Sequence, residues 1–324
     1  MLRTRLTELL GIEHPVLGGC MQWISGPEFA AAVSEAGGLG VMSSATFPTP
    51  EEFRGALRRI KALTERPFAV NLNLFPALRP IDNRLYVEVI LEEGGVTAVE
   101  TSGGRPPEDL VEKLRENGVL LMHKCTTVRH ALVARDMGYH AVTVFGSEGG
   151  GHIGDADLTF LSLVPRAVDE LDIPVIAAGG IADGRGLAAA LALGAEGVLI
   201  GTRLLLSTES PVHEAVKRRL LEARETDTTV ILGSVHNRLR VWRNAAALKA
   251  AELERAGAPF EEIIKVVAGS LTREMFRTGD PDGGIMVCGQ DVGLIREVKP
   301  VAEIISGMVE EAEAVLERMA ALRV

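Results

Sequence analysis

The chain has 324 residues, a formal net charge of −10, and hydrophobic residues at 47% of its positions. This length suits a single elaborated α/β barrel, and the apolar content is enough to build a large core. Because the acidic residues are spread along the chain, a nucleic acid or an anionic membrane would be repelled on average, and we expect neither as a partner. We expect a small-molecule ligand instead, since backbone amides and one or two cations can hold even an anionic one locally.

The three cysteines, Cys20, Cys125 and Cys288, are widely separated in the chain. They form no CxxC or Cys/His cluster, and an odd number argues against a disulfide framework, so we expect neither a structural metal nor disulfides. The N-terminal segment lacks the apolar core of a signal peptide, and no uncharged run is long enough to span a membrane. These features predict a soluble protein of the cytoplasm.

Short apolar runs alternate with amphipathic stretches from the start of the chain to about residue 205. Runs that are continuously apolar are typical of strands buried on both faces. The predicted strands are Pro15–Gly18, Leu39–Ser43, Phe68–Leu74, Ala98–Thr101, Leu120–Lys124, Ala141–Phe145, Val175–Ala178 and Gly197–Ile200.

Helix start and stop signals lie between these strands. Ser25 and Thr49 each offer an N-cap hydroxyl, with a proline in the first turn and a glutamate three residues later. Gly37, Gly38 and Gly194 are typical of helix ends. Eight strand–helix units predict a (β/α)8 TIM barrel, and a doubly wound open sheet is the alternative because local pattern does not reveal closure.

The pattern changes after residue 205. Three helices with no strand between them are predicted at Pro211–Ala223, Arg238–Ala256 and Pro259–Val267. We expect residues 210–280 to form a helical cap over a barrel made of residues 1–209 and 281–324. Asp280–Gly293 is then a glycine-rich return loop and Val301–Arg323 a final helix, which packs on its own barrel or on a second copy in a homodimer.

Glycines follow the last two predicted strands, as Gly179-Gly180 and as Gly201-Thr202. They let the backbone approach a ligand closely, and a helix beginning at each place directs N–H groups at an anion. In TIM barrels this is the usual phosphate site, and the sequence predicts one here. The alternative is that these glycines only make tight turns.

The sixth predicted strand runs into the sequence SEGGGHIG, which contains Gly149, Gly150, Gly151 and His152. Ordering such a loop is costly, because glycine loses the most conformational entropy on folding. The loop brings an imidazole to the mouth of the barrel, and histidine is suited to proton transfer near neutral pH. The alternative is a solvent-exposed loop histidine. His123, inside the fifth strand, is expected to be a core residue with its hydrogen bonds satisfied.

Lys124 ends the fifth predicted strand, where it is directed towards the mouth. It can hold a phosphate or compensate negative charge on a reduced flavin, and the alternative is a snorkelling lysine. We interpret its neighbour Cys125 as a buried structural thiol, since no histidine partner is evident from the spacing.

Asn71 and Asn73 stand at alternate positions of the third predicted strand, so they face the same side. An amide inside a barrel needs a partner, and a planar ring with donors and acceptors along its edge provides one. The first strand ends in an accessible glycine loop followed by Met21 and Trp23, which are either ligand-lining or ordinary packing residues.

Taken together, these motifs resemble the nitronate monooxygenase family, formerly called 2-nitropropane dioxygenases. The resemblance covers nearly the whole chain, because the order and spacing of the motifs match. The matching motifs are HPVLGGCMQW, AGGLGVMSS, PFAVNLNL, HKCTTVRHAL, SEGGGHIGD, PVIAAGGIADGRG, GVLIGTRLL and GGIMVCGQDVGLI. The family implies a barrel that binds FMN without a covalent bond, and a helical cap over the substrate.

The resemblance also implies roles for individual residues. His152 matches the proposed catalytic base, and Gln290 in the return loop is expected close to the flavin ring. The phosphate cradle matches Gly179, Gly180, Gly201 and Thr202. The positions that line the flavin match Cys20, Met21, Gln22, Asn71, Asn73, Lys124 and Gly150.

The sequence departs from the nitronate-oxidising members at two places. They usually have E-A-G-G-H where this chain has Glu148–His152, and G-G-M where it has Gly19–Met21. The HKCTTVRHAL motif resembles a bacterial branch of NAD(P)H:quinone reductases, in which the loop at residues 76–80 would gate the nicotinamide. The loops at His152 and Gly180 also resemble flavin-dependent enoyl-acyl-carrier-protein reductases. Nitronate oxidation with dioxygen is the leading hypothesis, and a sugar-phosphate barrel without a redox cofactor is the remaining alternative.

Overall fold

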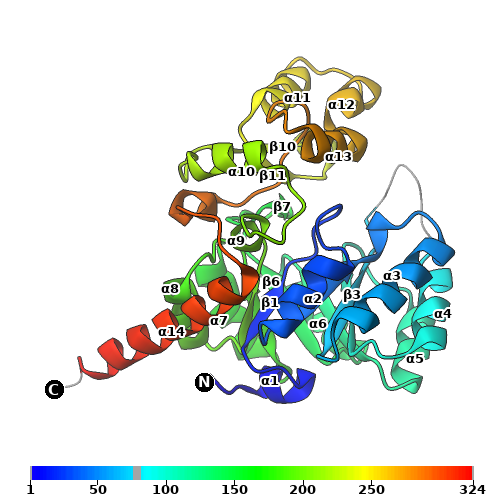
Figure 1. Ribbon diagram of the computed structural model, residues 1–324, viewed down its shortest axis with the longest axis vertical. Helices are drawn as coiled ribbons and strands as arrows, with labels where there is room; N and C mark the ends of the chain where they lie inside the picture. The colour runs from blue at the N-terminus through cyan, green and yellow to red at the C-terminus, as the bar shows by residue number, and fades with distance from the viewer. Residues whose placement is uncertain (1, 76–81, 323–324) are drawn as a thin grey trace.

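The computed structural model describes residues 2–75 and 82–322 of the chain. Its centre is a parallel sheet with the strand order β1-β9-β8-β6-β5-β4-β3-β2. These strands are β1 (Val16–Gly18), β2 (Gly40–Ser43), β3 (Phe68–Asn73), β4 (Ala98–Ser102), β5 (Leu120–Cys125), β6 (Ala141–Phe145), β8 (Val175–Ala178) and β9 (Gly197–Ile200). A parallel bridge between Leu17 and Leu39 joins the two ends of the sheet. The predicted (β/α)8 barrel is therefore confirmed (Figure 1).

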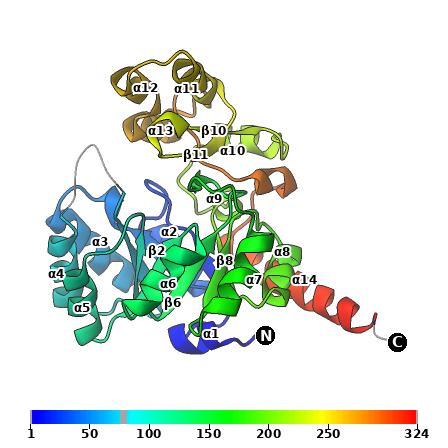
Figure 2. The ribbon, with the colours of Figure 1, turned by 180° about the vertical axis from the view of Figure 1, so that it is seen from behind.

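Helices surround this barrel on the outside (Figure 2). They are α2 (Pro27–Glu35), α3 (Pro50–Leu63), α4 (Asn83–Glu93), α5 (Glu108–Glu116), α6 (Val128–Asp136), α7 (Phe160–Glu170) and α8 (Gly184–Ala192). The short α9 (Thr202–Leu205) lies at the end of the barrel instead. The last helix, α14 (Val301–Ala320), packs along α8, where Gly184 lies against the backbone of Met308 and Ala312. It begins at Val301 as predicted and ends before Arg323, which lies outside the described residues.

The interior of the barrel changes from apolar to polar along the strands. At the N-terminal end, Leu6 and Leu10 of α1 (Arg5–Leu10) close the barrel and pack with inward residues such as Ala98 and Met122. At the carboxyl end, buried Asn71 and Glu100 replace these apolar side chains. Polar groups are costly inside a core, so this layer marks the functional end of the barrel.

One of the two predicted helix caps is confirmed. Thr49 caps α3 through a capping box with Glu52. At α2 the prediction is wrong, because Gly26 is the N-cap. Ser25 is buried instead, where its hydroxyl accepts a hydrogen bond from the Met21 amide and donates one to the Gly19 carbonyl. Ser25 thus shapes the loop after β1.

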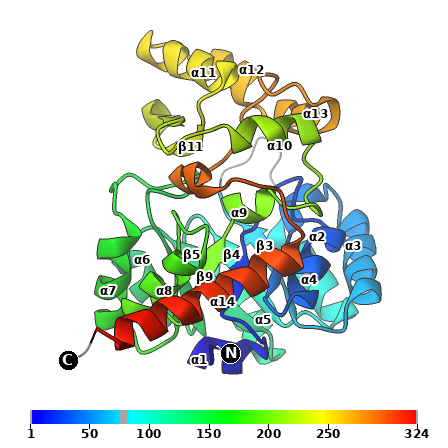
Figure 3. The same ribbon diagram turned by 60° about the vertical axis from the view of Figure 1, so that its left-hand side comes forward.

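The cap (residues 210–280) lies over the carboxyl end of the barrel (Figure 3). Its helices are α10 (Glu214–Leu221), α11 (Ala245–Arg255), α12 (Phe260–Val267) and α13 (Gly269–Thr278). The prediction that it contains no strand is wrong. β10 (Thr228–Ile231) and β11 (Leu239–Trp242) pair antiparallel, and β11 occupies the start of the predicted helix Arg238–Ala256. The β-branched and aromatic residues in TTVI and LRVW favour strands, and the helix begins only after its N-cap Asn244.

In the part of the chain that the structure describes, no helix is both long and apolar enough to cross a membrane. Cys20, Cys125 and Cys288 are free thiols.

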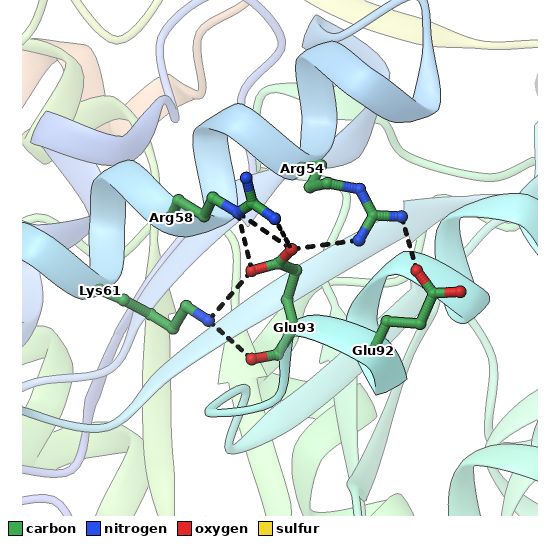
Figure 4. A network of polar contacts seen from close by, with 5 residues as sticks. All are labelled: Arg54, Arg58, Lys61, Glu92 and Glu93. Carbon is green, nitrogen blue, oxygen red and sulfur yellow. Dashed lines mark hydrogen bonds and ion pairs between the residues drawn. The ribbon is translucent and has the colours of Figure 1, made fainter.

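A network of ion pairs joins two outer helices (Figure 4). The Glu93 carboxylate at the end of α4 accepts hydrogen bonds from Arg54 and Arg58 of α3, at 3.1 and 2.8 Å. Lys61 donates to the Glu93 carbonyl at 2.6 Å. Hydrogen bonds from Arg58 and then Arg54 lower the pKa of Glu93 from 4.5 to about 2.

Glu93→Gln tests this network. Because its pKa is lower in the folded protein than in the unfolded chain, the ionised carboxylate stabilises the fold above pH 4.5, and this contribution is lost as the pH falls towards 2. We expect the variant to unfold at a lower urea concentration than the wild type at pH 7, and the difference to shrink between pH 4.5 and 2. Glu88→Gln, which breaks only the exposed pair with Lys113, is the control and should change little. If Glu93→Gln lowered the urea concentration of unfolding by the same amount at pH 7 and at pH 3, this account would be contradicted.

Candidate active site

The polar layer at the barrel mouth comes from three adjacent strands. Asn71 of β3 stands in register with Glu100 of β4, while Asn73 stands in register with Ser102, and Ser102 with Lys124 of β5. Register partners in a parallel sheet share a face, so all five side chains belong to the same side of the sheet. Three of the predicted site residues, Asn71, Asn73 and Lys124, are therefore brought together.

Glu100 connects this layer and was missed by the sequence analysis. Its side chain is fully buried, and its Oε2 accepts hydrogen bonds from Asn71 Nδ2 at 2.6 Å and from Lys124 Nζ at 3.3 Å. The partner of the Asn71 amide is thus Glu100, with the Ser102 hydroxyl 3.3 Å away. A lone carboxylate in the predicted buried strand Ala98–Thr101 was the signal that could have revealed this residue.

The positive charge in this polar layer is on Lys124. Burial lowers its pKa, but the nearby Glu100 carboxylate and Cys20 outweigh this effect, and the pKa is raised overall. Burial raises the pKa of the Cys20 thiol to about 11, and Lys124 lowers it only in part. At neutral pH the mouth therefore holds an ammonium group beside a neutral thiol. Cys125 is buried, as predicted for a structural thiol.

His152 is held at the mouth by a strand of the cap. β7 (Gly151–His152) pairs antiparallel with β11, which places His152 opposite Leu239. Its ring stacks on Phe75, with ring centroids 4.2 Å apart and planes 20° apart. Burial, and then the Lys124 charge, lower the pKa of His152 to about 4. The imidazole is therefore neutral at physiological pH, and it is half-buried rather than an exposed loop residue.

The return loop crosses directly over the His152 loop. A Cβ on Gly150 would lie 2.4 Å from the Cys288 carbonyl carbon, so only glycine fits there. The backbone N–H of Gln290 donates a hydrogen bond to the backbone carbonyl of Glu148 at 2.9 Å. This bond brings Gln290 to the His152 loop, and the Gln290 side chain is exposed. Arg240 of β11 donates to the Ser147 carbonyl at 2.8 Å from the other side.

The predicted phosphate residues form one group beside this crossing. Gly179 and Gly180 adopt left-handed conformations, with φ of 95° and 77°. Among the described residues, the amides of Gly180, Gly201 and Thr202 donate to no protein acceptor. The Thr202 hydroxyl accepts a hydrogen bond from the Gly289 amide at 2.9 Å, which connects the return loop to the start of α9, directly after β9.

The predicted use of the α8 N-terminus for an anion is wrong. The side chain of its N-cap Asp183 accepts from the amides of Arg185 and Gly186. Glu311 of α14 accepts from the Gly184 amide at 2.8 Å. These two carboxylates occupy the first amides of α8, so donors for an anion remain on the glycine turns and not on this helix.

The other predicted residues lie at the edge of this group. Met21 faces Gly201, where a Cβ would lie 3.9 Å from the Met21 sulfur. Gln22 is exposed, and its Nε2 donates to the Ala45 carbonyl at 3.2 Å. The guanidinium of Arg273, from α13 of the cap, lies over the Trp23 ring at 4.9 Å from the ring centroid. His123 is a buried core residue as predicted, with its Nδ1 2.8 Å from the Thr101 hydroxyl.

Gly150→Ala tests the crossing of the two loops. The added methyl group would clash with backbone that cannot rotate away, and overpacking of this kind costs about 1–3 kcal/mol. We expect a lower melting temperature than for the wild type. Gly55→Ala in α3 is the matched control, because a Cβ there meets nothing within 4 Å and alanine is the better helix former. A melting temperature of Gly150→Ala equal to that of the wild type would refute the close contact between the two loops.

Known proteins resemble this chain over almost its whole length. The family model of nitronate monooxygenase matches residues 3–84 and 80–311. The (3aS,4S,5R,7aS)-5-hydroxy-7a-methyl-1-oxo-octahydro-1H-indene-4-carboxyl-CoA dehydrogenase of Rhodococcus jostii (strain RHA1) is 34% identical, with 99% of each chain covered. A probable nitronate monooxygenase of Staphylococcus saprophyticus is 30% identical, with 98% of this chain and 99% of that one covered.

Among solved structures, FabK from Thermotoga maritima superposes with a TM-score of 0.91 at 39% identity, over 99% of both chains. The motifs, the barrel and these relatives agree. The chain belongs to the nitronate monooxygenase family and is a flavin-dependent oxidoreductase.

Proposed function

We propose that the chain binds FMN at the barrel mouth and uses it to oxidise nitronates, or closely related carbon acids, with dioxygen. The observation that carries this proposal is the arrangement of His152 and Lys124 on one side of the mouth and the donor-rich glycine turns on the other. The name of the family supports the substrate class.

The residues at the mouth fit FMN. The free amides of Gly180, Gly201 and Thr202 are suited to a phosphate, because backbone N–H groups bind anions without the cost of ordering a side chain. A Cβ on Gly201 would meet only Met21, so space remains above this turn. Asn73, Cys20 and Met21 would contact the ring, and Lys124 would stand by it. Bound FMN supplies two-electron oxidation and reduction.

The protein's own groups then have distinct tasks. The neutral His152 ring presents a nitrogen that can accept a hydrogen bond or a proton from a substrate carbon acid, and its stacking on Phe75 fixes its orientation. The Lys124 ammonium stabilises negative charge that develops at the mouth. A nitronate is already an anion, so for this substrate His152 would orient it rather than remove a proton.

Reduction of an enoyl thioester is the second candidate, and the likeness to FabK favours it. FabK, an enoyl-acyl-carrier-protein reductase, is 39% identical, and the CoA dehydrogenase of Rhodococcus is 34% identical. FabK supports the reduction itself, whereas the Rhodococcus relative is a dehydrogenase and supports only a substrate carried by CoA. Quinone reduction with NAD(P)H as co-substrate is the third candidate, and the loop at residues 76–80 that was expected to gate the nicotinamide lies outside the described residues. The non-redox sugar-phosphate barrel is set aside, since the family is a redox family.

Anaerobic stopped-flow spectroscopy of the FMN-loaded protein separates these candidates. We expect a nitronate to reduce the flavin, and His152→Ala to slow this reduction by less than the roughly 10²–10⁴-fold that the loss of an acid–base residue costs, because the imidazole only orients this anion. Rapid reduction by NADH or NADPH, followed by reoxidation with crotonyl-CoA, would instead select enoyl reduction, and reoxidation with a quinone only would select quinone reduction. No spectral change with a nitronate at high concentration would refute nitronate oxidation.

A further inference from the structure

Glu100 has no part in the function proposed above, although it is the most deeply buried charged group at the mouth. Its residue has no exposed surface, so it cannot touch a substrate or a flavin. Its Oε1 has no hydrogen-bond partner among the described residues, and Oε2 holds Asn71 and Lys124. An ionisable side chain in this position is costly and needs a compensating role.

The position of Glu100 below Lys124 shows what it can do. Lys124 keeps 18% of its side-chain surface exposed at the mouth, while its Nζ lies 3.3 Å from the Glu100 carboxylate beneath it. On the other side, Lys124 stands in register with Thr143 of β6, which is fully buried and has an unpartnered hydroxyl. Glu100 is therefore the carboxylate that balances the Lys124 ammonium, and its bond to Asn71 fixes it to β3.

We propose that Glu100 is a positioning residue, which holds the Lys124 ammonium at the barrel mouth and keeps it protonated, and thereby sets the charge that the bound group meets. The effect of Glu100 on Lys124 does not require a bound ligand. The part concerning the bound group rests on the proposed FMN site. Besides Glu100, the titratable groups that interact with Lys124 are Cys20, His123 and His152.

Glu100→Gln is the informative variant. The amide keeps the shape of the side chain and an oxygen that can accept from Asn71, but it removes the charge. Without its counterion, the buried Lys124 ammonium should lose its proton at a lower pH, because Cys20 alone then opposes the effect of burial on the Lys124 pKa. Glu100→Asp keeps the charge at a shorter reach and should restore the behaviour in part. Glu93→Gln is the matched control, since it removes a carboxylate from an ion-pair network on the outer helices (Figure 4).

The first measurement uses the flavin-free protein. Competitive acetylation of Lys124 is followed by mass spectrometry as a function of pH, and circular dichroism confirms that each variant is folded. We expect the titration midpoint of Lys124 to be lower in Glu100→Gln than in the wild type. In Glu100→Asp it should lie between these two values, and in Glu93→Gln it should equal that of the wild type. An unchanged midpoint in Glu100→Gln, or equal midpoints in Glu100→Gln and Glu100→Asp, would overturn the proposal whether or not FMN binds.

The second measurement is the midpoint potential of the FMN-loaded protein as a function of pH. While Lys124 remains protonated, Glu100→Gln leaves one uncompensated positive charge, which should stabilise the reduced anionic flavin and raise the potential. This shift should disappear above the lowered Lys124 pKa, whereas a structural defect would give a shift that does not follow that pKa. A changed Lys124 midpoint with an unchanged potential would overturn the proposal. Failure to bind FMN at all would refute the proposed function and leave the first measurement to decide the role of Glu100.

Discussion

The organisation of the mouth depends on the contact between the backbone at Cys288-Gly289 and the loop that carries His152. Gly150 permits this contact because it has no Cβ, and the Thr202 hydroxyl fixes Gly289 from the side of β9. β11 of the cap pairs with β7 on the same loop. Three segments that are far apart in the chain, the β6 loop, the cap and the return loop, thus meet at one place. This junction orients the imidazole. Because the three segments are closely packed, a displacement of any one of them would displace the other two.

Electrostatics divide the mouth into two regions with different tasks. On the side of β3 to β5, a buried carboxylate supports an ammonium group, and burial together with that ammonium keeps His152 neutral. On the side of β8 and β9, backbone amides provide donors without a formal charge. A protein with a net charge of −10 can therefore receive an anionic ligand, because its local donors and not its overall charge face the ligand.

The sequence predicted the barrel well because strands buried on both faces must be continuously apolar, and the capping box at Thr49 is a purely local interaction. Predictions failed where the partner of a group comes from elsewhere in the chain. Glu311, 127 residues away, occupies an amide of α8. Ser25 is a different case, because its partners Met21 and Gly19 are close in sequence but belong to the loop after β1 and not to α2. The residues of Leu239–Trp242 favour a strand, but their pairing with Gly151-His152 joins segments that are far apart in the chain, and no local pattern reveals it. Glu100 could have been recognised as the one charged residue in a buried strand, but its contact with Lys124 depends on the register of the sheet.

The central claim is that FMN binds at this mouth through its phosphate. The most direct test compares the affinity of the flavin-free protein for FMN and for riboflavin by fluorescence titration. Hydrogen bonds to a charged group contribute about 1.5–3 kcal/mol each, so the loss of several should weaken riboflavin binding by at least about a hundredfold. Equal affinity for the two flavins, or no binding of either, would contradict the account.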